Sequence, residues 1–531
     1  MADRRAEYRR QGWWRDETFS DDLRGLARTR PDKAAMVVRH LAPGGAGTRV
    51  VTFAELDRMA DRCAGALLEL GVRRGDFVAL QLPNRWEIAP LLLGCWRAGA
   101  RLCSIGPHYR SQGLRHMIGL TEARVFITAA GLGGEGHAEM LGELADELPA
   151  LEHVLLFEDA RRFFFDTAWE ERHPADPSGG RELGPDEPCL VLFTSGTTGE
   201  SKGSLHSQNT LYAPLLGEVG VFGLGPDDII TMATIYTHYT GLVRGILMPL
   251  TLGATMAFQD LWEGPDMLDL IEEHRVTFLY GTPAAVLDLV DARRAATHGA
   301  TTLTCIVSGS APVPSHLVDD VRDTFGVRLY ALWGMTENGA VTITRPEDPE
   351  DWAAHSDGRP IADMQVRIDP MKDREDGAGL LWVRGPTQCL GYYARDALYA
   401  ANLDEDGWFD TGDLARDDGR GGIRLVGRAG DIILHHAIPV SAVQVEDALT
   451  RHPKVREAAV VGIPDGVDEL VCAVLTTTGQ GVTLPELRDH LKAAGMSKMF
   501  WPERLEIVDT LPRTETGKIR KNELQKRYSP S

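Results

Sequence analysis

The chain has 531 residues, of which 43% are hydrophobic and 25% are charged. These proportions are close to ordinary globular usage and exclude a wholly disordered chain. The 77 Asp and Glu residues outnumber the 56 Lys and Arg residues, which gives a net charge of −21. This balance is the opposite of that expected for a general nucleic-acid binder. We therefore expect no nucleic-acid partner, and an anionic ligand would need a local cluster of positive charge.

The first four-fifths of the sequence alternates helical periodicity with short apolar runs. Thr52 and Glu55 have the spacing of a capping box at the start of a helix that ends near Gly71. Residues 86–96 are predicted to form a buried helix, and the glycine-rich stretch 130–142 a loop. Strands are predicted at residues 77–82, 124–128, 153–157, 189–193 and 304–307. Strands that alternate with helices favour an α/β fold with mostly parallel sheets.

The last hundred residues have a pattern of their own. An acidic, glycine-rich stretch at residues 404–430 is interpreted as a boundary between domains. Beyond it the pattern predicts helices and strands at residues 443–449, 458–462, 470–475, 485–494 and 504–508. That is enough for a separate small α+β lobe.

The seven cysteines are widely spaced and contain no C-x-x-C pair. This is typical of free thiols in a reducing compartment rather than of disulfides or a zinc site. The N-terminus reads MADRR with no apolar segment behind it, so we expect no secretory signal. No run of about 18 apolar residues is present, which predicts no membrane span. Together these features predict a cytoplasmic protein.

The strongest chemical signal follows the predicted strand at 189–193. Residues 193–203 read FTSGTTGESKG. Glycines let the backbone approach an anion, and hydroxyl and N–H groups can donate to its oxygens. The run is not a Walker loop, because Ser201 stands where that motif has its second glycine. We interpret it as a phosphate-binding loop, with a surface turn as the alternative. The residues assigned to it are Thr194, Ser195, Gly196, Thr197, Thr198, Gly199 and Lys202.

This run resembles the phosphate loop of adenylate-forming enzymes, the superfamily of acyl-CoA synthetases, luciferases and peptide-synthetase adenylation domains. Further motifs are similar to those of the family and follow in its order: GSAP at 309–312, WGMTE at 333–337, LWVRG at 381–385, GYY at 391–393, WFDTGD at 408–413, GR at 427–428 and LPRTETGK at 511–518. The resemblance implies an N-terminal adenylation domain at residues 1–427. It also implies a mobile C-terminal domain at 428–531 that carries a catalytic lysine and rotates on a hinge between two half-reactions.

The family's reaction joins a carboxylic acid to the α-phosphate of ATP and releases pyrophosphate. Two anions must meet, so the site must supply positive charge and positioning. The resemblance implies that Lys518 bridges the carboxylate and the α-phosphate, that Thr336 holds this phosphate, and that Glu337 helps to hold Mg²⁺. It further implies that Asp413 accepts the ribose hydroxyls and that Arg428 lies near ribose or phosphate. The other predicted ATP-binding residues are Gly309, Ser310, Ala311, Trp333, Gly334 and Met335.

Each of these residues has an ordinary alternative. Thr336 and Glu337 could form a helix N-cap pair, and Asp413 could be a solvated turn residue. Lys518 could belong to a solvated basic face, and Trp333 to the core. These alternatives do not predict that all the motifs occur together.

The segment 236–241 corresponds, by resemblance, to the His-x-x-Gly gate of the family's acid pocket. His238 stands at the gate, where amino-acid-activating relatives place an Asp nearby, so we expect no α-amino acid substrate. The alternative is a core histidine. The surrounding residues are largely apolar and aromatic, which suits an alicyclic or aromatic acid. The predicted acid pocket consists of His238, Tyr239, Gly281, Gly309, Trp333, Gly334 and Met335.

Closer resemblance is carried by YRRQGWW at 8–14, HYTG at 238–241, residues 253–262 and ALWGMTENGAV at 331–341. These look like cyclohexanecarboxylate-CoA ligases and coronafacate-type ligases, which form amides with amino acids. The stretch 8–14 is also similar to dihydroxybenzoate-AMP ligases.

The predicted hinge region departs from the family pattern. Gly430 replaces a Lys or Asp, His435 and His436 replace a Gly-Gly pair, and Gln444 replaces an acidic residue. Imidazoles in place of glycines should narrow a passage for pantetheine, although drift in a surface loop would look the same. CoA and an amino acid amine therefore both stay open as acyl acceptors, and a carrier protein is a third. An oxidative luciferase-like enzyme and a non-enzymatic scaffold are the competing classes.

Overall fold

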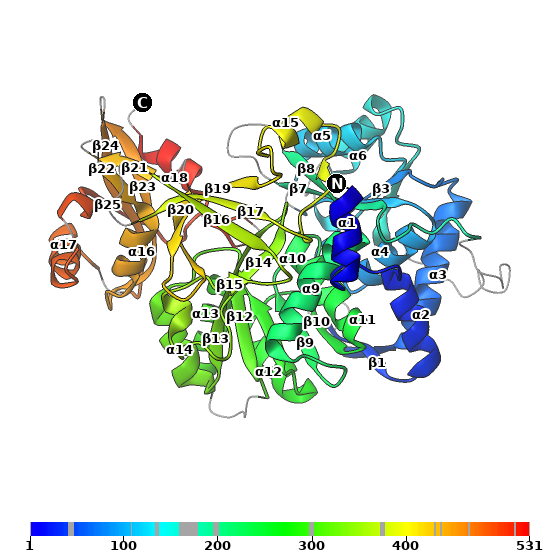
Figure 1. The fold of residues 1–531 in the computed structure, drawn as a ribbon, viewed down its shortest axis with the longest axis horizontal. Helices are drawn as coiled ribbons and strands as arrows, with labels where there is room; N and C mark the ends of the chain where they lie inside the picture. Colours follow the sequence, from blue (N-terminus) through cyan, green and yellow to red (C-terminus); the bar gives the residue numbers. More distant parts are fainter. Residues whose placement is uncertain are drawn as a thin grey trace.

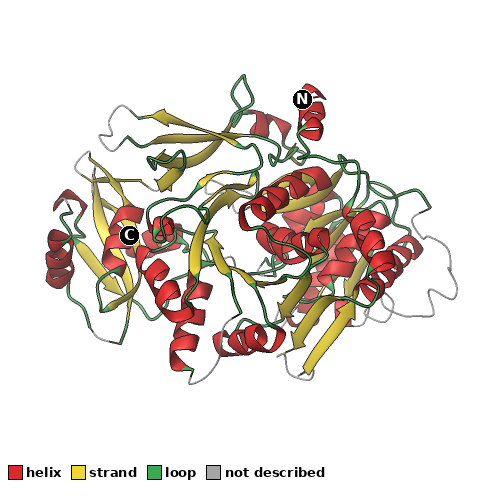
Figure 2. Cartoon of the chain, turned by 60° about the horizontal axis from the view of Figure 1, so that its bottom comes forward, coloured by secondary structure: helices red, strands yellow, loops and turns green. Residues whose placement is uncertain are grey.

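The computed structural model describes residues 2–40, 47–107, 109–132, 137–158, 179–194, 201–296, 302–371, 377–428, 432–435, 438–465, 468–479, 481–496, 498–514 and 517–529. Figure 1 shows a large part that holds the N-terminal and central elements of the chain and a smaller part formed by the C-terminal elements. In Figure 2 the helices of the large part pack around its strands. The predicted arrangement of a large, mostly parallel α/β part with a smaller C-terminal part is confirmed.

The first large sheet has nine strands. Their order is β15 (Arg359–Pro360), β14 (Gly339–Ile343), β13 (Arg328–Met335), β12 (Cys305–Gly309), β11 (Phe278–Gly281), β9 (Ile229–Ala233), β10 (Thr255–Gln259), β1 (Ala34–His40) and β2 (Gly47–Thr52). The strands from β13 to β1 run parallel. Because the carboxyl ends of parallel strands meet at one edge, the ends of β11, β12 and β13 lie together.

The second large sheet has seven strands. Their order is β18 (Gly391–Tyr392), β8 (Lys202–Ser207), β7 (Pro188–Thr194), β4 (Arg101–Ser104), β3 (Phe77–Gln81), β5 (Val125–Thr128) and β6 (His153–Leu156). β7 through β6 are parallel, while β8 and β18 are antiparallel to their neighbours. All the strands predicted from apolar runs in the large part are therefore present, within a few residues of the predicted bounds.

Helices surround these sheets. In chain order they are α1 (Ala2–Arg10), α2 (Phe19–Thr29), α3 (Phe53–Glu69), α4 (Ile88–Arg97), α5 (Ser111–Thr121), α6 (His137–Glu147), α9 (Gln208–Phe222), α10 (Tyr239–Leu242), the π-helix η2 (Val243–Leu247), α11 (Met248–Leu252), α12 (Gly264–His274), α13 (Pro283–Ala295), α14 (Ser315–Phe325) and α15 (Asp396–Ala400). The Thr52–Glu55 capping box at the start of α3 is confirmed. All ten residues of α4 are buried. A Cβ built on Gly94 would lie 2.4 Å from Cys63 Cβ, so α3 and α4 pack closely there.

One prediction about an irregular segment was wrong. The stretch 130–142 is not all loop, since α6 begins at His137 and buries Leu141 and Leu144. The stretch 404–430, which was interpreted as a boundary between domains, contains regular structure. Most of it is a hairpin of β19 (Phe409–Asp417) and β20 (Ile423–Arg428) in an antiparallel sheet with β16 (Gln365–Pro370) and β17 (Gly379–Arg384). Buried apolar residues on these strands, such as Phe409 and Leu414, stabilise the hairpin within the fold.

The C-terminal elements form their own core. β21 (Ile432–His435) pairs with β22 (Ile438–Ser441), and β23 (Val455–Asp465), β24 (Asp468–Thr477) and β25 (Arg504–Ile507) form a three-stranded sheet. Helices α16 (Ala442–Thr450), α17 (Leu484–Ala493) and α18 (Lys521–Tyr528) accompany them. We call these elements, β21 through α18, the C-terminal lobe. The predicted start of a second domain at Arg428 coincides with the end of β20, and the division itself stays a prediction.

All seven cysteines are buried and unpaired. Within the described part of the chain, no helix has the length and hydropathy that crossing a bilayer requires.

Candidate active site

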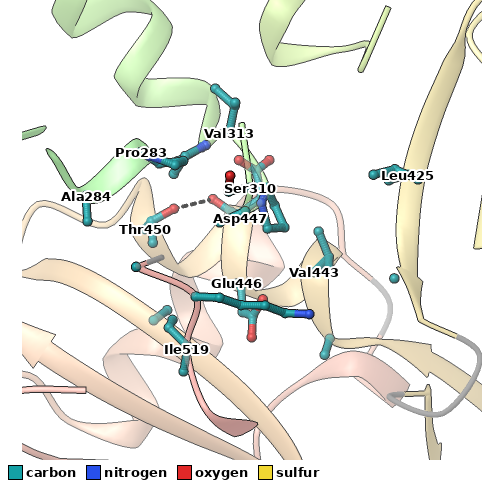
Figure 3. Close-up of a pocket in the computed structure, with 18 of the residues that line it drawn as sticks. Pro283, Ala284, Ser310, Val313, Leu425, Val443, Glu446, Asp447, Thr450 and Ile519 are labelled. Atoms are coloured by element: carbon teal, nitrogen blue, oxygen red, sulfur yellow. Dashed lines mark hydrogen bonds between the residues drawn. The ribbon is translucent and has the colours of Figure 1, made fainter. Parts of the chain in front are cut away.

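A cavity of about 300 Å³ lies between the large part and the C-terminal lobe. Figure 3 shows Ser310 of the large part facing Asp447 and Val443 of α16 across this space. The predicted ATP-binding residues that line it are Ser310, Ala311, Trp333, Gly334, Asp413, Arg428 and Lys518. Residues as far apart in the sequence as Ser310 and Lys518 therefore meet at one cavity.

The C-terminal lobe reaches this cavity through the turn before Lys518. Gly517 has a φ of +78°, and a Cβ built on it would lie 3.0 Å from Thr282 Oγ1. Glycine is favoured here both by its backbone conformation and by the close approach to the large part. This contact places the exposed Lys518 side chain at the cavity wall.

Asp413 is the centre of a buried polar group. Its strand β19 pairs with β20 so that Asp413 stands directly opposite Arg428. Arg428 Nε lies 3.0 Å from Asp413 Oδ1, and Trp333 Nε1 donates to Oδ2 at 3.1 Å. Burial raises the pKa of Asp413, although the charges of Arg428 and Lys518 act in the opposite direction. Asp413 is only 7% exposed and is therefore not a solvated turn residue.

Glu337 lies in the turn between β13 and β14, so the helix N-cap interpretation of Thr336 and Glu337 is wrong. Its Oε1 accepts a hydrogen bond of 2.9 Å from Tyr392 Oη. The Lys202 ammonium lies 5.4 Å from the centre of the Tyr392 ring. Burial raises the pKa of Glu337, and the charges of Arg428 and Lys202 oppose this shift. The end of the predicted phosphate loop and the predicted metal ligand are thus neighbours.

A metal ion would find few protein ligands here. Among the described residues, no group of three His, Cys, Asp or Glu side chains could hold one. Glu337 offers a single buried carboxylate, with one oxygen bonded to Tyr392. Mg²⁺ is usually bound by one or two carboxylates together with substrate phosphates and water. The residues present therefore fit Mg²⁺ that arrives with a nucleotide.

The predicted phosphate loop is described only at its ends. Ser195, Gly196, Thr197, Thr198 and Gly199 lie outside the described residues. Thr194 ends β7 and Lys202 begins β8, and the two residues stand opposite each other in the antiparallel pair. The run therefore connects two strands of a hairpin.

The predicted acid-pocket residues come from four neighbouring elements. Gly281, Gly309 and Trp333 stand at or near the ends of β11, β12 and β13, followed by Gly334 and Met335. His238 is half-buried at the start of α10, and Tyr239 is buried next to it. A Cβ built on Gly339 would lie 2.4 Å from Tyr239 Oη. Trp333 and Gly334 line the cavity described above, whereas His238, Tyr239, Gly281, Gly309 and Met335 are not among its lining residues.

Comparison with known proteins identifies this arrangement. A family model described as AMP-binding enzyme matches residues 23–393, and the AMP-binding enzyme C-terminal domain matches residues 444–518. The chain belongs to the AMP-binding enzyme family. The predicted superfamily is thereby confirmed, and the chain is an adenylate-forming ligase that uses ATP.

Curated relatives span nearly the whole AMP-binding enzyme. Triostin synthetase I of Streptomyces triostinicus is 32% identical over 529 residues, which cover 98% of this chain and 96% of the relative. Salicyl-AMP ligase / salicyl-S-ArCP synthetase of Mycobacterium tuberculosis is 31% identical over 535 residues, covering 98% and 92%. The solved structure of the anthranilate CoA ligase AuaEII in complex with anthranoyl-AMP has a TM-score of 0.84 at 24% identity, covering 97% and 98%.

Sequence reasoning missed one residue of this AMP-binding enzyme's site. His206, on β8, is fully buried, and its Nε2 donates to the Thr336 carbonyl oxygen at 2.8 Å. Its ring centre lies 5.3 Å from that of Tyr239. His206 thus joins a predicted phosphate-binding residue to a predicted acid-pocket residue. No local motif marks it, because the contact depends on how the two sheets meet.

We expect His206 to make stability depend on pH. Burial lowers the pKa of His206 to about 4, whereas an unfolded histidine has a pKa near 6.5. The unfolded state therefore binds more protons between these values, and stability falls as the pH drops through this window. His206→Gln removes this dependence. When the pH is lowered from 7 to 5, the free energy of unfolding of the wild type should therefore fall by about 2 kcal/mol more than that of the variant. Urea unfolding at both pH values measures it, and an equal difference at both would contradict the prediction.

Polar contacts hold the C-terminal lobe against the AMP-binding domain. The Ser315 N–H and hydroxyl donate to Asp447 Oδ1 at 3.1 and 2.9 Å, and Arg451 Nε donates to Ser315 Oγ at 2.8 Å. Arg456 lies 3.0 Å from Asp291 of α13. These contacts stabilise the arrangement in which Lys518 lines the cavity.

Ser315→Ala should weaken this arrangement. The variant loses the hydroxyl contacts with Asp447 and Arg451. This loss should destabilise the packing of the C-terminal lobe against the AMP-binding domain by about 1 kcal/mol. We expect roughly fivefold slower pyrophosphate release with an unchanged Tm. Thr478→Ala is the control, since that hydroxyl donates to the Pro453 carbonyl oxygen within the lobe. Equal rates for the two variants would show that these contacts do not assist closure.

Proposed function

We propose that the enzyme activates an alicyclic or aromatic carboxylic acid as its acyl-adenylate, releases pyrophosphate, and then transfers the acyl group to an acceptor. The observation that carries this proposal is the meeting of Asp413, Arg428, Trp333 and Lys518 at one cavity. Asp413, Arg428 and Trp333 form a group that is joined by hydrogen bonds. Lys518 comes from the C-terminal lobe. Such a site can bind a nucleotide and then receive positive charge where two anions react.

In the first step a carboxylate oxygen forms a bond to the α-phosphorus, and the bond from this phosphorus to the bridging oxygen of pyrophosphate breaks. Lys518 lies at the cavity wall, where its ammonium can face both anions. Each oxygen of Asp413 already accepts one hydrogen bond and keeps further lone pairs for ribose hydroxyls. When bound, Mg²⁺ would neutralise phosphate oxygens beside Glu337.

The acid pocket has features that favour a ring. A Cβ built on Gly309 would lie 2.4 Å from the Leu332 carbonyl oxygen, and one on Gly334 would lie 2.0 Å from the Gly339 carbonyl oxygen, so the strand ends pack closely beside the predicted pocket. Tyr239 and Trp333 supply aromatic surface around it. The salicyl-AMP ligase and the anthranoyl-AMP complex carry the names of ring acids, which supports the same substrate class here.

The acceptor is proposed as CoA, an amino acid amine or a carrier protein. The names of the anthranilate CoA ligase and of the salicyl-AMP ligase / salicyl-S-ArCP synthetase support a thiol as the acyl acceptor. The obstruction of a pantetheine passage by imidazoles stays a prediction. His435 is buried and its Nδ1 lies 2.8 Å from the Glu469 carbonyl oxygen within the C-terminal lobe, while Gly430 and His436 lie outside the described residues.

Pyrophosphate release across a panel of acids tests the proposal. Benzoate, salicylate, anthranilate and cyclohexanecarboxylate are compared with octanoate and with α-amino acids. With at least one ring acid, pyrophosphate release should be more than about tenfold faster than with octanoate or any α-amino acid. The shape of a pocket can supply a difference of this size. Mass analysis with CoA, an amino acid or a phosphopantetheinyl carrier then identifies the acceptor. Fastest release with an α-amino acid or a linear acid would refute the proposed substrate class.

A further inference from the structure

A fully buried ion pair lies behind the acid side of the site. Arg244, in the π-helix η2, bonds to Glu218 of α9 through Nε at 2.9 Å and Nη2 at 2.7 Å. Both side chains are at most 2% exposed. Neither residue belongs to the lining of the cavity between the lobes.

Such a pair needs an explanation beyond stability. Removing two charges from water costs several kcal/mol per ion, and well-packed apolar side chains of similar volume are often equally stable. The segment that carries Arg244 is also irregular, because π-helical turns are rare and occur frequently at functional sites. η2 follows directly on α10, which holds Tyr239.

A chain of contacts leads from the pair to the cavity wall. The Arg244 guanidinium carbon lies 4.8 Å from the centre of the Tyr280 ring on β11. Tyr280 Oη lies 3.5 Å from Ser310 Oγ. A Cβ built on Gly309 would lie 2.7 Å from the same Tyr280 Oη. Ser310 lines the cavity and has a φ of +69°, a backbone conformation that non-glycine residues rarely adopt unless their surroundings hold it.

Tyr239, a residue of the predicted acid pocket, is the second tyrosine on which the pair acts. The charges of Arg244 and Glu218 both act on buried Tyr239, whose hydroxyl lies against Gly339. The ion pair therefore contacts Tyr280, which lies beside the Gly309–Ser310 turn, and acts through its charges on Tyr239, which belongs to the predicted acid pocket.

We propose that Arg244 and Glu218 are positioning residues that fix the shape of the acid pocket by holding Tyr280, and through it the Gly309–Ser310 turn. The inference rests on the proposed function, because it assigns these residues to binding of the ring acid. They do not touch the reacting atoms. Their loss should weaken binding of the acid and leave the chemical step nearly unchanged.

The test separates positioning from folding by comparing single and double variants. Arg244→Met alone leaves a buried carboxylate unpaired and should lower the Tm. The double variant Glu218→Leu/Arg244→Met should recover most of this loss. With the best ring acid, the double variant should show a KM for the acid raised about tenfold, with kcat and the KM for ATP changed less than threefold. Tyr280→Phe, which keeps the ring and loses the hydroxyl, should raise the same KM about threefold.

Arg97→Met is the matched control. Arg97 is equally buried and pairs with Asp57 and Asp61 between α3 and α4. It should lose stability without a change in the KM for the acid. The inference would be overturned if the double variant had the wild-type KM for the ring acid and ranked the acids of the panel as the wild type does. A variant in which only the KM for ATP rose would overturn it as well. Failure of the proposed function is distinguishable, because then the wild type itself would use no ring acid.

Discussion

Replacing Lys518 with alanine should slow formation of the acyl-adenylate by about 10²–10³-fold, the range found when one preorganised charge-stabilising group is removed. The side chain is exposed at the cavity wall, and its charge acts on buried Asp413. The backbone of Lys518 is fixed by hydrogen bonds with Thr514 that alanine retains. The Tm of the variant should therefore equal that of the wild type. Acid-dependent pyrophosphate release, measured at saturating ATP, gives the rate.

The matched control is Lys526→Ala on α18 of the same lobe. Lys526 is exposed and does not line the cavity, so its loss should leave the rate unchanged. If Lys518→Ala and Lys526→Ala had the same small effect, the cation that bridges the two anions would have to come from elsewhere.

The second large effect is expected from Asp413→Asn. The amide keeps the size of the carboxyl group but loses the charge opposite Arg428 and half of the acceptor capacity for ribose. We expect kcat/KM for ATP to fall by about 10²-fold, mainly through KM. Stability should hardly change, because burial already disfavours the charged form of Asp413, as its raised pKa indicates.

Asp417→Asn tests whether this effect is specific. Asp417 lies on the same strand, β19, but is exposed and accepts a hydrogen bond from the Gly419 N–H in the following turn. Its replacement should leave the KM for ATP at the wild-type value. An unaltered KM for ATP in Asp413→Asn would remove Asp413 from the nucleotide site.

The sequence predicted those parts of the site that are carried by contiguous motifs. Asp413, Arg428 and Trp333 were each predicted from a short run, and they meet in the structure because β19, β20 and β13 bring those runs together. Helix α3 was predicted because its capping box and apolar spacing are local properties. The hairpin β19–β20 lies in the stretch that was interpreted as a domain boundary, and its strands were not predicted, since glycines and acidic residues dominate the composition there while the buried positions of β19 are interrupted by exposed ones.

Other features could not be predicted because they depend on contacts between distant residues. His206 and Thr336 are 130 positions apart, and nothing beside either residue signals the other. Glu218 and Arg244 lie in apolar helical segments where each alone looks like an exposed charge on a helix face. Only the packing of α9 against η2 shows that both are buried.

Transfer of oxygen from the acid to AMP tests the central claim most directly. The ring acid with the fastest pyrophosphate release is labelled with ¹⁸O in both carboxylate oxygens and incubated with ATP, enzyme and acceptor. If a carboxylate oxygen attacks the α-phosphorus and the acyl–oxygen bond then breaks, AMP must carry one ¹⁸O. Label in inorganic phosphate, or unlabelled AMP, would contradict activation through an acyl-adenylate.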